Sequence, residues 1–170
     1  APIGPVTPPG DPVALISIPH LGLEQVVVEG TASQDLLHGP GHLRNTVLPG
    51  QVGTSAVFGR AATYGGPFAR LAELRPRDII NVATAQGELT FTVLGVRRAG
   101  DPLPQPRADG VARLVLVSAE GTGRLPSLSP EGVVYIDAEV KAKDAFPAPP
   151  GLPAAVPESE QAMGTESEAL

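Results

Sequence analysis

The segment DIINVATAQGELTFTVLGVRR, residues 78–98, decides the fold class of this chain. Two runs rich in Val, Ile and Thr, residues 78–85 and 89–98, lie on either side of Gly87. Such residues favour strands, and a glycine between two such runs is typical of a hairpin turn. The segment therefore predicts two neighbouring antiparallel strands with no helix between them.

The same composition recurs along the chain at short intervals. Further runs of this kind occupy residues 14–18, 24–30, 54–59, 113–119 and 132–140. Seven or eight short strands at this spacing favour an all-β barrel or sandwich. Helical signals are confined to a turn at 32–39, with Ser33 as its N-cap, and to an apolar-periodic stretch at 67–76.

Both ends of the chain are rich in proline. Such stretches are typical of extended linkers, because they carry no apolar periodicity on which a core could form. The sequence predicts an N-terminal arm over residues 1–12 and one β domain over residues 13–143. Residues 144–170 are predicted to form a C-terminal linker and tail, first proline-rich and then acidic.

The charge distribution argues against a nucleic-acid partner. The chain of 170 residues has a net charge of -6, and its last twenty residues carry four glutamates without a basic residue: Glu158, Glu160, Glu166 and Glu168. The remainder holds 14 acidic and 12 basic residues, and the whole chain has four Phe, two Tyr and no Trp. Neither a basic stripe nor a stacking platform is present.

Metal, thiol and membrane chemistry are not expected either. The absence of cysteine excludes disulfides, thiolate metal sites and thiol nucleophiles. The histidines, His20, His38 and His42, lack the helical spacing of a metal pair, so no metal or cofactor is predicted. No apolar run is long enough to cross a bilayer, and membrane contact is expected only through a segment outside this sequence.

The stretch RLVLVSAEG, residues 113–121, is a candidate site at the end of a buried strand. Its last strand positions, Ser118 and Ala119, offer only a hydroxyl and a methyl. A serine nucleophile needs an adjacent base, and no histidine lies near Ser118 in the sequence. Ser118 is therefore expected to end the strand by hydrogen bonding.

Three segments together resemble the sortases, β-barrel transpeptidases that fix proteins to the envelope of Gram-positive bacteria, and particularly their actinobacterial and minor-class members. The segments are ISIPHLGLEQVVVEG at 16–30, the stretch from LLHGPGH to DIINVAT at 36–84, and RLVLVSAEG at 113–121. The placement of glycine and proline in HGPGH and LPGQVGTSAVFG makes the resemblance specific. It covers roughly residues 13–139. It implies a closed barrel of seven or eight strands with one or two short helices.

The resemblance also implies where catalytic residues would lie. A sortase uses a cysteine thiolate, a histidine that moves protons and an arginine that holds the substrate. The family histidine position is Arg60 here, the cysteine position is Ala119, and the arginine position lies near Pro130. A guanidinium stays protonated at neutral pH and cannot act as a base, and a methyl group cannot attack a carbonyl. No catalytic residue is expected, and the chain is predicted to be a pseudo-enzyme.

The positions around the vacated site are candidates for binding instead: Arg60, Ser118, Ala119, Glu120 and Arg124. Three readings of Arg60 stay open. It could pair with Glu120, capture a carboxylate of a partner, or be a partly exposed arginine on a loop.

The sequence therefore predicts a non-catalytic, extracytoplasmic module of cell-surface assembly that binds an extended peptide or an envelope protein. The family implies that the full-length protein is anchored in a membrane. Two alternatives remain: an active sortase transpeptidase, including one inactivated by exchange of cysteine for alanine, and a structural subunit of an envelope complex.

Overall fold

The computed structural model describes residues 7–32, 34–37, 39–61, 66–119 and 133–149. Within these residues the chain forms one closed barrel of eight strands. The strands are β1 (Pro12–Ile18), β2 (Leu23–Glu29), β3 (Gly41–His42), β4 (Gly53–Arg60), β5 (Ile79–Thr84), β6 (Gly87–Arg98), β7 (Ala112–Ala119) and β8 (Val134–Val140). The predicted all-β barrel is confirmed.

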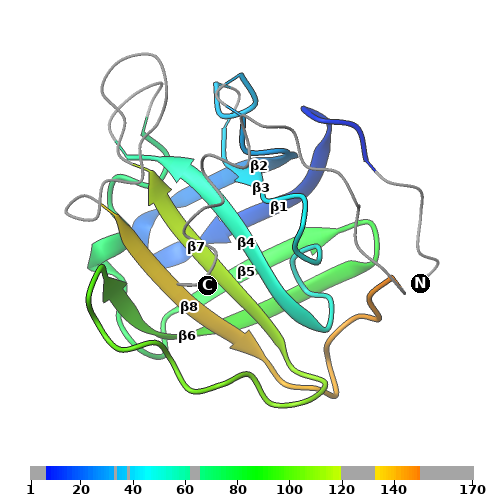
Figure 1. Ribbon diagram of the computed structural model, residues 1–170, viewed down its shortest axis with the longest axis vertical. Coiled ribbons are helices and arrows are strands. Elements are labelled where there is room, and N and C mark those ends of the chain that lie inside the picture. Colours follow the sequence, from blue (N-terminus) through cyan, green and yellow to red (C-terminus); the bar gives the residue numbers. More distant parts are fainter. Residues whose placement is uncertain (1–6, 33, 38, 62–65, 120–132, 150–170) are drawn as a thin grey trace.

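The strands follow the order β1-β2-β3-β4-β7-β8-β6-β5 around the barrel. Two neighbouring pairs, β2 with β3 and β4 with β7, are parallel, and the other pairs are antiparallel. Figure 1 shows β4, β7 and β8 lying side by side across the front of the barrel. This order brings together the ends of β4 and β7, which are far apart in the sequence.

The two-residue strand β3 was not predicted, because it is too short to show an alternating pattern. It forms where Gly41 packs directly against the chain at Gly30. A Cβ atom at Gly41 would overlap the carbonyl oxygen of Gly30, so only glycine allows this close approach. The glycine of the HGPGH segment is therefore required for β3 to pair with β2 and β4.

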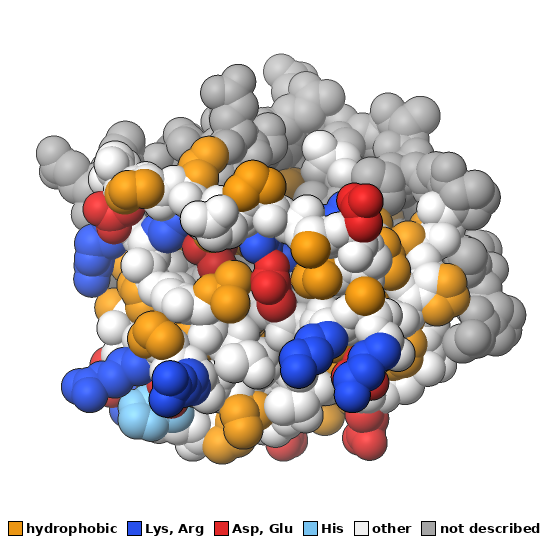
Figure 2. Space-filling view, turned by 90° about the horizontal axis from the view of Figure 1, so that it is seen from below, with side chains coloured by type: hydrophobic (Ala, Val, Ile, Leu, Met, Phe, Trp, Pro, Cys, Tyr) orange, Lys and Arg blue, Asp and Glu red, His pale blue; other side chains and the backbone are white. Residues whose placement is uncertain are grey.

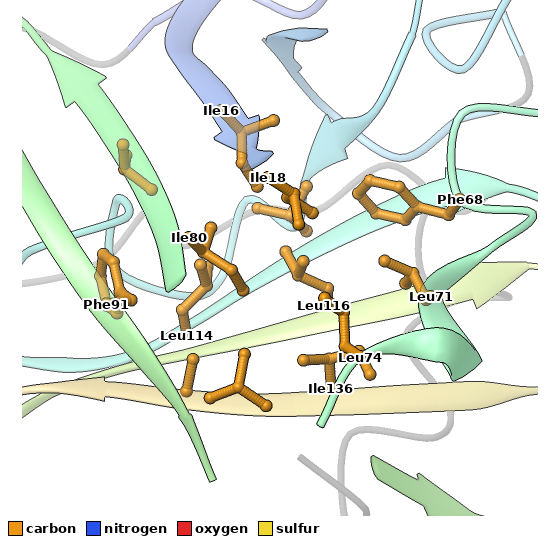
Figure 3. Close-up of a cluster of buried hydrophobic side chains, with 14 of the residues drawn as sticks. Ile16, Ile18, Phe68, Leu71, Leu74, Ile80, Phe91, Leu114, Leu116 and Ile136 are labelled. Atoms are coloured by element: carbon orange, nitrogen blue, oxygen red, sulfur yellow. The ribbon is translucent and has the colours of Figure 1, made fainter. Parts of the chain in front are cut away.

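Apolar side chains pack on both faces of β7. Figure 3 shows the cluster inside the barrel, which includes Leu114 and Leu116 of β7. A second cluster lies on the outer face, where Val115 and Val117 pack with Phe58, Leu43 and others. A strand buried on both faces needs a continuous apolar run, which explains the sequence of residues 114–117.

The helical signals gave only short turns. The described helices are two 3-10 turns, η1 (Pro19–Leu21) and η2 (Leu71–Glu73), and none of the described helices is long and apolar enough to cross a membrane. Around η2, Phe68, Leu71 and Leu74 are all buried. Their spacing of three residues fits the three residues per turn of a 3-10 helix. Residues 34–37 form a turn as expected, while Ser33 lies outside the described residues.

Residues assigned to the arms by composition contact the barrel at both ends. The amide of Gly10 donates to the carbonyl of Glu29 at 2.7 Å. At the other end, Phe146 exchanges backbone hydrogen bonds with Gly50 and Val52 at 2.8 and 2.9 Å. The limits of the arms stay predictions, but the chain leaves the barrel surface only beyond these contacts.

Candidate functional site

The parallel strands β4 and β7 end side by side. Their register pairs Gly59 with Ser118 and Arg60 with Ala119. The two positions that the family pattern assigns to histidine and cysteine are thus neighbours on adjacent strands. The geometry of a site is therefore present, although the residues at it are an arginine and an alanine.

Arg60 is the last residue of β4 and is only 2 % exposed. Its alternation with Phe58 places it on the outer face of the barrel, since strand residues two apart share a face. Its carbonyl accepts a hydrogen bond from the amide of Phe68 at 3.0 Å. The reading of Arg60 as a partly exposed loop residue is wrong, because the barrel encloses it.

Gly59 fixes the path of the chain into this position. A Cβ atom at Gly59 would lie 2.5 Å from the ring of Phe68, closer than packed carbon atoms approach. Gly59 faces the barrel interior, where Phe68 belongs to the core cluster. The absence of a side chain at Gly59 therefore allows Phe68 to pack directly beneath the end of β4.

Ser118 has a structural hydrogen bond. Its Oγ accepts the backbone N–H of Val134 on β8 at 3.1 Å, and the residue is 2 % exposed. The hydroxyl thus links the ends of β7 and β8, the role that the sequence favours for it. This contact supplies no base to Ser118, which argues against serine catalysis.

His42 lies in a buried network between β2, β3 and β4. Its Nδ1 is 2.5 Å from Oε1 of Glu29, and its Nε2 is 2.7 Å from the carbonyl of Val47 and 3.1 Å from Oγ1 of Thr46. Thr46 Oγ1 in turn accepts the amide of Ala56 at 3.1 Å. Both ring nitrogens are engaged, so His42 holds strands together rather than serving a reaction. The sequence did not reveal Glu29 as its partner.

Some predicted site residues lie outside the described part of the chain: Glu120, Arg124, Pro130 and, among the histidines, His38. Their roles stay predictions. In the ranges that are described, no three His, Asp or Glu side chains gather in a way that could hold a metal ion. The described site therefore consists of Arg60, Ser118 and the backbone at Ala119.

A sortase-type barrel with these paired strand ends agrees with the comparison to known families. The model of the sortase domain family matches residues 16–117. The chain belongs to the sortase family.

Known sortases show how far the likeness extends. Sortase D of Bacillus subtilis is 29 % identical over 85 residues, which is 50 % of this chain and 41 % of that protein. The structure of sortase E from Streptomyces avermitilis is 25 % identical, with a TM-score of 0.60 over 90 % of this chain and 99 % of that one. A structure of Clostridium perfringens sortase C with the C-terminal cell wall sorting motif has a TM-score of 0.63 at 19 % identity, over 78 % and 71 % of the two chains, and shows likeness of fold alone.

Proposed function

We propose that this chain is a sortase-family module that binds an extended peptide or an envelope protein and does not catalyse transpeptidation. One observation carries the proposal: the ends of β4 and β7 are paired, but they hold Arg60 and Ala119. The scaffold of the reaction site is kept and its reactive groups are replaced.

The chemistry of acyl transfer supports this proposal. The reaction needs a nucleophile and a group that accepts and returns a proton near neutral pH. Arg60 stays protonated, and Ala119 has no nucleophilic atom. The hydroxyl of Ser118 bonds to Val134, and both nitrogens of His42 are engaged elsewhere. None of the four residues supplies either function.

Binding needs less than catalysis. An extended peptide gains affinity from hydrogen bonds to its main chain and selectivity from pockets for its side chains. The guanidinium of Arg60 has the planar geometry that suits a carboxylate of such a peptide. The related sortase C structure with a sorting motif supports a peptide as the partner class. Glu120 and Arg124 are proposed to border the same site.

The family also suggests where the module acts. We place it outside the cytoplasm, at the cell surface, with a membrane anchor in a part of the protein beyond this sequence. The proline-rich arms would then be semi-rigid spacers between the barrel and its anchor or its partner. Its role would be the assembly of surface proteins.

A turnover assay tests the loss of chemistry. We expect the chain to release no product above the buffer rate from a fluorogenic sorting-motif peptide supplied with an amine acceptor. The variant Ala119→Cys is expected to stay inactive, because Arg60 cannot move the required proton. Turnover by the natural chain that is abolished in Ser118→Ala would show serine catalysis and contradict the proposal.

A further inference from the structure

A groove lies on the outside of the barrel, away from the paired ends of β4 and β7. Strands β6 and β7 are both antiparallel to β8, so residues 99–111, which connect them, must return along the length of β8. In Figure 1 this connection runs along the lower edge of the barrel. Between it and the strands is a groove of about 490 Å³. This volume lies within the range of sites that bind small ligands and peptide segments.

The floor of the groove carries two ion pairs that neutralise each other's charges. Arg97 donates from Nε and Nη2 to the carboxylate of Asp137 at 2.7 and 2.9 Å. Arg113 donates to Oε2 of Glu139 and, at 2.6 Å, to the carbonyl of Gln105 in the connection. Each cation has its own carboxylate, so the floor favours an uncharged ligand over a strong anion or cation.

Two polar atoms of this floor are still available. Nη1 of Arg97 and Oε1 of Glu139 make no hydrogen bond within the described part of the chain, and both residues line the groove. Arg97 is 6 % exposed and is held in place over the ring of Tyr135 at 4.6 Å. A fixed donor and a fixed acceptor therefore face the same groove.

Their spacing matches a peptide main chain. Asp137, which holds Arg97, and Glu139 are two positions apart on β8, or about 7 Å along a strand. An extended peptide presents its C=O and N–H groups on one side at the same interval. The walls add apolar surface from five residues: Leu94, Val96, Pro102, Pro104 and Pro106.

We propose that this groove is a second binding site, which takes a short uncharged peptide segment in extended form with apolar side chains. The segment accepts a hydrogen bond from Nη1 of Arg97 and donates one to Oε1 of Glu139. Its side chains lie against the prolines of the connection. Figure 2 views the molecule from this lower side, where hydrophobic side chains lie among acidic and basic ones.

Gly95 offers a way to fill the groove without disturbing the barrel. It lines the groove and pairs with Asp137 on β8. A Cβ atom built at Gly95 meets no other atom within 4 Å, and its backbone does not adopt a positive φ. The side chain of a Gly95→Leu variant would therefore occupy the groove instead of overlapping with the protein.

The test is a titration of the isotope-labelled chain, followed by NMR, with short peptides made of proline, leucine, valine and alanine. We expect saturable shifts of the amides of Gly95, Arg97 and Glu139. Gly95→Leu should weaken binding by about tenfold or more and leave the melting temperature unchanged. The variant Ile79→Ser, which alters an exposed residue of β5 outside the groove, should bind as the natural chain does.

Three results would overturn this proposal: no saturable shift at these amides, equal binding of matched peptides that carry a central Asp or Lys, or undiminished binding by folded Gly95→Leu. Shifts confined to Phe58, Arg60 and Ser118 would also overturn it. That last pattern would support binding at the ends of β4 and β7, so the two proposals fail separately.

Discussion

Replacing Asp137 with alanine is expected to lower the free energy of unfolding by about 3–5 kcal/mol. The two side chains of the Arg97–Asp137 pair are 7 % and 3 % exposed, and two hydrogen bonds join them. Removing the carboxylate leaves a guanidinium enclosed between β6 and β8 without its counter-charge. The loss is large because the charge left behind is already out of water, and not because the pair is intrinsically strong.

Urea denaturation measures this effect, and two controls bound it. An Arg97→Met, Asp137→Leu double variant should lose much less stability, because it buries no unpaired charge. The exposed pair Arg70–Glu73 is the matched surface control. There the hydrogen bond lowers the pKa of Glu73, so any stabilisation is present at neutral pH and lost as the pH falls through that pKa. Arg70→Ala should leave the denaturation midpoint nearly unchanged, and a midpoint equally unchanged in Asp137→Ala would contradict the buried pair.

Replacing Glu29 with alanine is the second change with a large expected effect, again about 3–5 kcal/mol. Glu29 and His42 have side chains that are 5 % and 2 % exposed, on the neighbouring strands β2 and β3. The carboxylate is the partner of Nδ1 in a network that continues through Thr46 to the backbone of β4. Without it, Nδ1 of His42 is left buried without a partner and the short strand β3 loses its main side-chain tie to β2.

Glu29→Gln separates hydrogen bonding from charge in this network. The amide can still bond to His42, so we expect a loss clearly smaller than that of Glu29→Ala in the same denaturation assay. Amide hydrogen exchange should also quicken first at β3 and the adjacent part of β4. Equal stability of Glu29→Ala and the natural chain would show that the network does not hold these strands together.

The sequence predicted most of the strands and the place of the site, for a physical reason. Strand propensity and turn glycines are local properties, and they revealed the runs at 78–98 and 113–119 in advance. The strand β3 escaped because it depends on a contact between Gly41 and Gly30 and not on its own composition. The proposed helix at 67–76 shrank to one 3-10 turn because Phe68, Leu71 and Leu74 bury themselves with a spacing of three.

The burial of charged groups could not be predicted from the sequence. Arg97 and Asp137 are 40 residues apart, and only the pairing of β6 with β8 makes them neighbours. For the same reason, Arg60 looked like a loop residue until the β4–β7 pairing enclosed it. Family resemblance located positions 60 and 119 correctly on paired strands, yet it carried no information on how deeply Arg60 lies.

The central claim is that the paired ends of β4 and β7 bind a partner without reacting with it. The most direct measurement is capture of partners from a detergent-solubilised envelope extract, with the natural chain compared to a folded Ala119→Trp variant whose bulk fills the site. Our account predicts a partner, identified by mass spectrometry and recovered chemically unaltered, that the natural chain holds and the variant loses. A partner retained equally by both chains would place binding on another face or on the arms, and would contradict the account.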